Sequence, residues 1–542
     1  MAEPIDPNSG FCPATKVYHS LRPPAPLPPE TVPLSVTHYA FSLLLHHHQT
    51  TTSALIDAAT RHRIPYSDLP RHVNSLAASF RQIGLSKNDA ALVLVPNSVH
   101  VPILYLALYS LGVVVSPSNP ASSPSDISRQ IYLSKPAVAF ATSDTAHKLP
   151  CLRYKTILLD SPEFETMLNS TRYEGLELPE VFQSDTAAIL YSSGTTGKIK
   201  GVVLTHGNII ATMAGARAGM PARTSPAVAL CTVPYFHVYG FIYCVRSLAF
   251  GDSVVSMRRF DMQLMLRAVE ELKVTHLALA PPVAVAMANG GSGVVERFDL
   301  GSLEVVLSGG APLTNAVVEK FKRRFPNLPI LQAYGLTETT GAVTRTIGPS
   351  ESKVLGATGR LISNCQAKIV DPHTGIGLPP NKQGELCVRG PYVMKGYVSD
   401  EEAVTPVLDS EGWLRTGDLC YFNSEGFLFF VDRLKELIKY KAFQVPPAEL
   451  EQLLQSHPDV VDAAVIPYPD EEAGQVPMAF VVRRSGSKVN ESQIMEFVAQ
   501  QVASYKKIRR VSFIDSIPKN APGKVLRKEL IKLSLSGAKS KL

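Results

Sequence analysis

The chain has 542 residues, of which 45% are hydrophobic and 18% charged, and its formal net charge is +6. This length allows two or more domains with large cores, and the composition is that of an ordinary globular enzyme, not of a disordered or fibrous protein. The small positive charge gives no reason to expect a nucleic-acid partner. Seven scattered cysteines without a C-x-x-C pair argue against a disulfide framework and a structural zinc site.

The N-terminal segment indicates neither export nor a membrane anchor. It is polar and proline-rich as far as Pro29, which is unlike a secretory signal. The most apolar region, 101–115, contains Pro102 and is shorter than the roughly 20 residues that a membrane helix needs. We therefore expect no membrane span.

Between about residues 70 and 335, short apolar runs alternate with amphipathic segments. This alternation predicts an α/β fold with mainly parallel sheets. A helix carrying Val73 and Phe80 should end near Gly84, and Thr314 could cap a second helix. The expected strands are 90–96, 112–116, 137–141, 156–160, 187–191, 228–234, 254–257, 275–280, 305–308 and 330–333.

A glycine- and hydroxyl-rich loop follows the expected strand 187–191. Its glycines allow backbone N–H groups to converge, and its hydroxyls and lysines add donors and charge, so the loop suits a polyphosphate. It is not a Walker A loop, because Ser192 and Ile199 stand where that motif needs Gly and a hydroxyl residue. A flexible linker is the alternative, but linkers do not normally lie between core strands. The candidate phosphate ligands are Ser192, Ser193, Gly194, Thr195, Thr196, Gly197 and Lys200.

The pattern changes after about residue 355. Segment 356–397 is rich in Gly, Pro and short β-like runs and predicts a small antiparallel unit. A polar stretch begins at Asp432, where we place the boundary between domains 1–431 and 432–542. The second domain reads as α+β, with helices starting near Pro447 and Glu491 and strands at 461–467, 478–482 and 510–514. Residues from Ser534 onward are expected to be disordered.

Three further segments carry candidate site residues. After an apolar run, Tyr334 could stack on a base, Thr337 could donate to a phosphate, and Glu338 could hold Mg²⁺. Asp418 could accept the hydroxyls of a ribose, and Lys524 lies on a Gly/Pro loop near the end of the second domain. Taken singly, each of these residues can also be explained without a function, as part of an exposed turn or as a surface charge.

Together these segments resemble the adenylate-forming superfamily of acyl-CoA synthetases, firefly luciferases and peptide-synthetase adenylation domains. The resemblance covers about residues 30–530 and is strongest to plant 4-coumarate:CoA ligases and their peroxisomal relatives. It implies a large N-terminal domain of layered α/β sheets with a small antiparallel β unit, and a small mobile α+β C-terminal domain. The segments that carry it are 192–201, 234–237, 308–312, 334–338, 415–418, 432–441 and 518–524.

The resemblance also implies a reaction in two steps. A carboxylate attacks the α-phosphate of ATP with Mg²⁺, and CoA then displaces AMP from the acyl adenylate. Lys524 would bridge the carboxylate and the α-phosphate, Asp418 and Arg433 would hold the ribose, and Glu338 would hold the metal. The further nucleotide residues would be Gly310, Gln332, Tyr334, Gly335 and Thr337.

For the second step, the C-terminal domain of relatives rotates about a linker residue that maps to Lys435. This rotation would bring in Lys439 and Gln444. Relatives usually carry Gly where this chain has Ala442, which makes the thioester step less secure than adenylation. An adenylate-forming protein with weak thioester activity is therefore one alternative, and a luciferase-like oxygenase is the other.

In relatives the acyl pocket is lined by segments that map to His237, Tyr239, Tyr243, Gly309, Gly341 and Ala342. Tyr239 matches a tyrosine of hydroxycinnamate ligases, but Tyr243 replaces a frequent serine. The pocket should therefore differ from a dedicated 4-coumarate pocket. Ser540-Lys541-Leu542 has the form of a peroxisomal address that an import receptor reads. It favours substrates of β-oxidation, namely cinnamates, fatty acids or oxylipin precursors, and without import the protein would be cytoplasmic.

Overall fold

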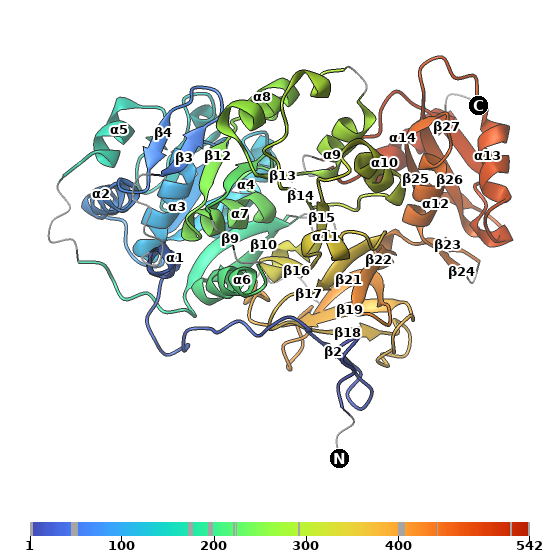
Figure 1. Cartoon of the computed structure of the whole chain (residues 1–542), viewed down its shortest axis with the longest axis horizontal. Helices are drawn as coiled ribbons and strands as arrows, with labels where there is room; N and C mark the ends of the chain where they lie inside the picture. The colour runs from blue at the N-terminus through green and yellow to red at the C-terminus, as the bar shows by residue number, and fades with distance from the viewer. Residues whose placement is uncertain are drawn as a thin grey trace.

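The computed structural model describes residues 4–44, 52–171, 177–192, 199–220, 223, 225–290, 293–398, 407–441, 443–520 and 523–539. Two large sheets and a helical layer form the N-terminal part of the molecule, and a smaller α+β unit forms the C-terminal part (Figure 1).

The first sheet has seven strands: β5 (Ala90–Leu94), β6 (Val114–Pro117), β7 (Val138–Ala141), β8 (Ile157–Leu158), β9 (Thr186–Ser192), β10 (Lys200–Thr205) and β20 (Gly396–Tyr397). Their order is β20-β10-β9-β6-β5-β7-β8. The strands from β9 to β8 are parallel, and β10 and β20 are antiparallel additions at one edge. All residues of β5 and β7 are buried, as expected for parallel strands covered on both faces.

The second sheet has fifteen strands: β1 (Phe11–Cys12), β2 (Val17–His19), β3 (Ser53–Asp57), β4 (Arg63–Pro65), β11 (Val228–Cys231), β12 (Ser253–Ser256), β13 (His276–Leu279), β14 (Val305–Ser308), β15 (Ile330–Leu336), β16 (Gly341–Arg345), β17 (Ala357–Leu361), β18 (Gln366–Val370), β19 (Gly384–Arg389), β21 (Leu414–Phe422) and β22 (Phe427–Arg433). Their order is β1-β2-β18-β19-β21-β22-β17-β16-β15-β14-β13-β11-β12-β3-β4. The run from β3 to β15 is parallel, and the run from β15 to β1 is antiparallel. The expected antiparallel unit is thus a continuation of the second sheet.

The helices of the N-terminal part are α1 (Val36–Leu44), α2 (Leu69–Gln82), α3 (His100–Ser110), α4 (Pro124–Ser134), α5 (Pro162–Leu168), α6 (His206–Ala218), α7 (Val238–Ala249), α8 (Met262–Leu272), α9 (Pro281–Asn289), α10 (Asn315–Arg324) and α11 (Gly348–Glu351). Helices α3 and α6 pack on the first sheet, α7 packs on β11 and β12 of the second, and all three contact one another. They form a layer between the sheets that shares one hydrophobic core with both. The apolar segment around Pro102 is therefore a core helix, and none of the described helices is long and apolar enough to cross a membrane.

The C-terminal part contains β23 (Ile438–Tyr440), β24 (Phe443–Val445), β25 (Val460–Asp470), β26 (Gly474–Arg483) and β27 (Arg510–Phe513), with α12 (Pro447–Gln455), α13 (Glu491–Ala499) and α14 (Arg527–Lys539). These strands form one sheet with a hydrophobic core of its own (Figure 1). The expected disorder from Ser534 is wrong as far as Lys539, because α14 continues there. Leu530 is fully buried under β25 and β26, and the Ser534 hydroxyl donates to the Ile531 carbonyl.

The expected fold class is confirmed, and each expected strand has a counterpart within a few residues of its predicted ends. Helix α2 ends before Gly84, which has the positive φ of +99° that favours glycine there. Thr314 occupies the N-cap position of α10, but its side chain makes no capping hydrogen bond. The boundary at Asp432 stays a prediction: this residue lies at the end of β22, and its Oδ2 accepts the Ala448 N–H over 2.8 Å.

Candidate active site

Glu338 links the two sheets of the N-terminal part. It lies in the short 3₁₀ turn Thr337–Thr339 that follows β15. Its Oε1 accepts hydrogen bonds from the Ser192 hydroxyl at the end of β9 and from the Tyr397 hydroxyl of β20, each over 2.9 Å. The Lys200 ammonium lies 4.7 Å from the centre of the Tyr397 ring. Glu338 Oε2 has no partner among the described residues.

A second cluster is centred on Asp418, which is 2% exposed. The Tyr334 hydroxyl donates to Asp418 Oδ2 over 2.7 Å, and Arg433 Nε lies 3.4 Å from Oδ1. Burial raises the pKa of Asp418, while Arg433, Tyr334 and Lys524 act to lower it. Asp418 and Arg433 are paired residues of the β21–β22 ladder, so the sheet itself fixes their separation. The sequence segments around 334 and 418 thus converge on one carboxylate.

Lys524 approaches this carboxylate from the C-terminal part. Its Nζ lies 3.9 Å from Glu436 Oε1, and the charges of Arg433 and Asp418 both act on it. Partial burial, followed by the repulsion from Arg433, lowers the pKa of Lys524 to about 8. The loop that carries Lys524 contacts the N-terminal part directly, because a Cβ on Gly523 would lie 2.6 Å from Pro282 Cδ of α9.

Glu436 is held by the C-terminal part. Arg527 Nε donates to Glu436 Oε2 over 3.0 Å, and the same guanidinium pairs with Glu451. Lys435, the expected hinge, is the exposed central residue of the 3₁₀ turn Leu434–Glu436.

Lys439 and Gln444 face each other in the hairpin of β23 and β24, and both are exposed. This hairpin lies at the outer side of the C-terminal part (Figure 1). The turn between its strands contains Lys441, which has a φ of +52°. Ala442 lies outside the described residues. The structure therefore brings Lys524, and not Lys439 or Gln444, to the Asp418 cluster.

The predicted acyl-pocket residues gather at the start of α7. The His237 Nδ1 atom accepts the Tyr239 N–H over 3.3 Å and so caps the helix, and burial lowers the pKa of His237 to about 4. A Cβ on Gly309 would lie 3.4 Å from the Tyr239 ring, and the Tyr239 hydroxyl donates to the Leu307 carbonyl over 3.0 Å. Tyr243 lies one turn further along the same helix.

The remaining predicted residues lie on the strands around these clusters. Gly310 follows β14 with a φ of +92°, and the Gln332 N–H donates to Thr346 Oγ1. Gly335 pairs with Ala342, and a Cβ on Gly335 would come within 1.9 Å of the Gly341 carbonyl oxygen, so only glycine fits. The predicted phosphate ligands Ser193, Gly194, Thr195, Thr196 and Gly197 lie outside the described residues.

Sequence reasoning missed Tyr397 and Glu436. Tyr397 falls in a Gly-rich segment far from the motif that it contacts, and nothing local indicates its partner. Glu436 could have been found, since it lies next to the predicted hinge Lys435 in a polar linker.

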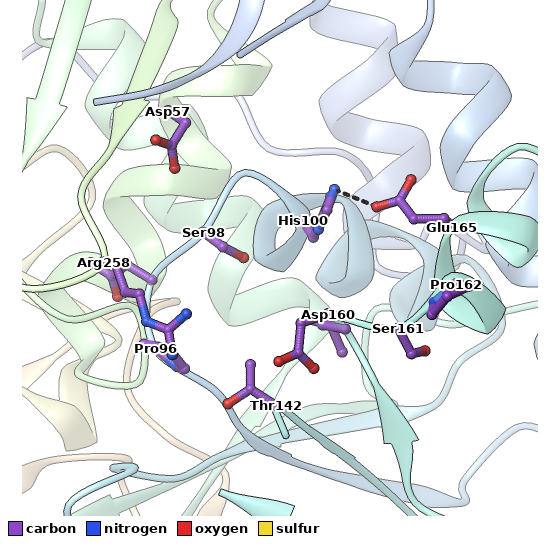
Figure 2. Close-up of a pocket in the computed structure, with 12 residues that line it drawn as sticks. Asp57, Pro96, Ser98, His100, Thr142, Asp160, Ser161, Pro162, Glu165 and Arg258 are labelled. Atoms are coloured by element: carbon purple, nitrogen blue, oxygen red, sulfur yellow. Dashed lines mark ion pairs between the residues drawn. The ribbon is translucent and has the colours of Figure 1, made fainter. Parts of the chain in front are cut away.

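A cavity of about 620 Å³ opens elsewhere, at the carboxyl ends of β3, β5 and β7 (Figure 2). None of the predicted site residues lines it. Arg258 pairs with Asp144 over 2.9 Å, and His100 lies 3.6 Å from Glu165. Some charged side chains of the cavity lining thus already have partners of opposite charge. The lining residues are Asp57, Pro96, Asn97, Ser98, His100, Thr142, Leu159, Asp160, Ser161, Pro162, Glu165 and Arg258.

The donor set around Glu338 fits a magnesium ion better than a zinc ion. No cluster of three His, Cys, Asp or Glu side chains suitable for a metal occurs within the described ranges. Mg²⁺ usually keeps several waters and is bound by one or two carboxylates together with substrate phosphates. A glutamate next to the expected phosphate loop, whose Oε2 has no partner in the part of the chain that the structure describes, meets that requirement.

The chain matches two family models and is similar to several plant ligases. Residues 46–398 match the model of the AMP-binding enzyme family, and residues 449–524 match that of the AMP-binding enzyme C-terminal domain. The chain is 49% identical to 4-coumarate–CoA ligase-like 9 of Arabidopsis thaliana, over 99% of this chain and 98% of that protein. It is 44% identical to peroxisomal OPC-8:0-CoA ligase 1 of the same plant, over 99% of both.

Among solved structures, o-succinylbenzoate CoA synthetase from Bacillus subtilis in complex with ATP and a magnesium ion superposes with a TM-score of 0.76. It is 26% identical and covers 91% of this chain and 99% of its own. The same synthetase in complex with its acyl-adenylate intermediate gives a TM-score of 0.78 at 27% identity, over 91% and 97% of the two chains. The chain therefore belongs to the AMP-binding enzymes and, within them, to the 4-coumarate–CoA ligase-like acid–thiol ligases.

Proposed function

We propose that this ATP-dependent CoA ligase acts on a cinnamate-like aromatic acid or on an aliphatic or oxylipin carboxylate. In the first step a carboxylate oxygen attacks the α-phosphorus of ATP, the bond to the bridging oxygen breaks, and pyrophosphate leaves. In the second step the CoA sulfur attacks the acyl carbon, AMP leaves with the electron pair of the C–O bond, and the thiol proton passes to solvent.

The observation that carries the first step is the approach of Lys524 to Asp418 and Arg433. An ammonium at this place can lie between the attacking carboxylate and the α-phosphate, two anions that otherwise repel each other. Asp418 would accept two ribose hydroxyls, and Arg433 acts against the effect of burial by lowering the pKa of Asp418. Because such chemistry depends on positioning and charge neutralisation, the site needs no protein nucleophile.

Glu338 would hold Mg²⁺ through its free oxygen, and the metal would neutralise charge on the phosphates. Ser192 and Tyr397 orient the carboxylate by bonding its other oxygen. Thr337 lies at the start of the same turn and would donate to the α-phosphate. Lys200 and the loop 193–198 would hold the β- and γ-phosphates.

The second step needs a different lining of the site. We propose that the domain 432–542 rotates about Lys435, which withdraws Lys524 and brings Lys439 and Gln444 inward. The exposed position of both residues supports this, because neither has an evident role in the arrangement described here. A short, exposed turn at Lys435 can absorb the backbone change of such a hinge.

Pyrophosphate release with and without CoA tests the function. The panel should contain cinnamate, 4-coumarate, benzoate and medium-to-long aliphatic acids. We expect CoA-dependent turnover on one of these classes, and we expect Lys524→Ala to abolish adenylation while ATP still binds. Unchanged pyrophosphate release in that variant would contradict the mechanism.

Two other outcomes would identify the alternatives. A stoichiometric burst of pyrophosphate that CoA does not extend would indicate an adenylate-forming protein with weak thioester activity. Light emission from the acyl adenylate would indicate a luciferase-like oxygenase.

We also propose that Ser540-Lys541-Leu542 is read by a peroxisomal import receptor. A relative 44% identical to this chain is named a peroxisomal ligase, which supports the proposal. A fluorescent protein fused to the N-terminus should reach peroxisomes with the intact tripeptide. It should stay in the cytoplasm when Leu542 is removed, and an unchanged distribution would contradict the proposal.

A further inference from the structure

Two elements lead away from the predicted acyl pocket, and each carries an arginine further along. Tyr239, Tyr243 and Arg246 share one face of α7 at intervals of four and three residues. On β16, Ala342 pairs with Gly335 and Arg345 pairs with Ala333. Gly335 and Ala333 are two residues apart on β15, so Ala342 and Arg345 lie on the same face of the sheet. Helix α7 packs against β16.

Both arginines lie further along their elements than the predicted pocket residues. From Tyr239 to Arg246 the helix rises by about 10 Å. A bulge in the β15–β16 pairing places Ala342 and Arg345 opposite residues that are two apart on β15, so Arg345 is displaced from Ala342 by about 7 Å along the sheet. Both arginines thus lie beyond the residues predicted to line the acyl pocket.

Contacts along α7 connect these residues. The rings of Tyr239 and Tyr243 lie 6.3 Å apart at 86°, and the Arg246 guanidinium lies 5.0 Å from the centre of the Tyr243 ring. Arg345 Nη2 donates to the Ala216 carbonyl of α6 over 3.1 Å, which places its guanidinium on the side of the interior helices. An aromatic wall therefore ends at two guanidinium groups.

Around Arg246 and Arg345, basic side chains outnumber the carboxylates that could pair with them. Burial, and then the charges of Arg246 and Arg22, lower the pKa of Arg345 to about 9. Within the ranges that the structure describes, neither Arg246 nor Arg345 forms an ion pair.

The neighbouring carboxylates are engaged elsewhere. Glu351 binds Arg22 through both oxygens, at 2.7 and 2.6 Å. Asp252 Oδ1 accepts the Ala227 N–H over 2.8 Å, and burial raises the pKa of Asp252 to about 6. Two more basic groups face the same region. Arg223 pairs with Glu304, and burial lowers the pKa of His276 to about 3, so that ring is neutral.

We propose that Arg246 and Arg345 bind an oxygen group, a carboxylate or a ketone, at the far end of the acyl substrate, beyond Tyr239 and Ala342. The inference rests on the proposed ligase function and names its substrate class: acids with a second oxygen acceptor at the distal end. A partly buried guanidinium without an anion is unfavourable, and a substrate oxygen supplies the missing partner. A plain alkyl end would leave both guanidinium groups without a partner, so the site discriminates against substrates that end in an alkyl group.

Three acids of matched length test the proposal: an α,ω-dicarboxylic acid, the corresponding ω-keto acid and the unsubstituted monocarboxylic acid, each in a series of chain lengths. The wild-type enzyme should use one oxygenated acid at least about tenfold better in kcat/KM than the plain acid. A preference for the dicarboxylic acid identifies an anion as the distal group, and a preference for the keto acid identifies a carbonyl.

Arg246→Met and Arg345→Met should each reduce this preference about tenfold, mainly through KM, and Arg246→Lys should restore part of it. Lys273→Met removes a surface charge that pairs with Asp299 and serves as the control. Arg345 also donates a hydrogen bond to α6, so Arg345→Met could change the stability of the fold. Its kinetics therefore count only if its Tm equals that of the wild type. If its Tm is lower, the result for Arg246→Met decides.

Equal or better use of the plain acid by the wild type, with the same ratio in both Met variants, overturns the inference. Failure of every acid to support CoA-dependent pyrophosphate release would instead overturn the ligase proposal.

Discussion

Asp418 and Arg433 face each other across the β21–β22 ladder, and Arg433 Nε lies 3.4 Å from Asp418 Oδ1. The pair matters because Asp418 is 2% exposed, and burial alone favours its protonated form. Arg433 is the largest of the influences that lower the pKa of Asp418. An ionised carboxylate can accept both ribose hydroxyls, whereas a protonated one cannot accept them equally well.

Arg433→Met should therefore shift the acid limb of the pH profile for adenylation to higher pH. Without the guanidinium, burial raises the pKa of Asp418 further, so that more of the carboxyl group is protonated at a given acid pH. Profiles of kcat/KM for ATP, followed by pyrophosphate release, measure this limb. Arg415→Met is the matched control, because Arg415 lies on the same strand as Asp418 but pairs with Glu385 of β19. An acid limb at the same pH in Arg433→Met and wild type would refute the role of the pair.

Lys524 should produce the alkaline limb of the same profile. Its pKa is about 8 in this structure and its protonated form is the one that bridges two anions, so adenylation should fall as pH rises through about 8. Lys524→Arg should keep its charge and lose this limb, at the cost of a lower rate.

The pKa of Lys524 is below that of a lysine in the unfolded chain, so the unfolded state binds more protons between the two pKa values. Stability should accordingly rise with pH above about 8 in the wild type, and less so in Lys524→Met, as denaturant titrations would show.

The dependence of adenylation on Mg²⁺ concentration should distinguish Glu338, the expected metal ligand, from Tyr397, which only orients it. Glu338→Gln should lower adenylation by about 100-fold or more, because it removes the charged oxygen expected to bind the metal. Tyr397→Phe should weaken Mg²⁺ activation by about tenfold, and high Mg²⁺ should rescue it, because only an orienting hydrogen bond is lost. The measurement is the Mg²⁺ concentration for half-maximal pyrophosphate release. Full rescue of Glu338→Gln by high Mg²⁺ would argue against direct ligation.

Gly335 should be far less tolerant of a side chain than Gly341. A Cβ on Gly335 would lie 1.9 Å from the Gly341 carbonyl oxygen, whereas a Cβ on Gly341 would have no heavy atom within 4 Å. Gly335→Ala should lower the free energy of unfolding by about 3 kcal/mol, the scale of overpacking in a core. Gly341→Ala should cost about 1 kcal/mol, because its φ is +112°. Thermal and denaturant unfolding compare the two, and an equal loss would contradict the packing argument.

Local patterns in the sequence predicted the parallel half of the fold well, because buried parallel strands read as short apolar runs and the connecting helices are amphipathic. They did not predict β1 and β2. That hairpin lies in a polar, proline-rich segment and pairs with β18, more than 340 residues away, so no local signal marks it. The C-terminal helix was missed for a related reason, since α14 packs on β25, which lies far from it in the sequence.

Within the site, the residue types indicated the chemistry but not the contacts. The motifs around Glu338, Asp418 and Lys524 were recognisable because glycines and charged groups break otherwise apolar runs. Tyr397, which contacts Glu338, and Arg246 and Arg345, which lie beyond the predicted acyl pocket, carry no such mark. Their positions depend on which strand pairs with which, and the sequence alone does not state this.

Lys439 and Gln444 should affect only the second half-reaction. Both are exposed on the β23–β24 hairpin while Lys524 lies near Asp418, so neither is available to adenylation in this arrangement. Lys439→Ala and Gln444→Ala should therefore keep ATP–pyrophosphate exchange within about twofold of wild type and lose at least about tenfold in acyl-CoA formation. Lys524→Ala should lose exchange but still convert a supplied acyl adenylate and CoA to thioester. Lys441→Ala is the control on the same hairpin, because its side chain pairs with the exposed Glu472. Equal losses in both half-reactions for Lys439→Ala would exclude a rotation that uses the two lysines in turn.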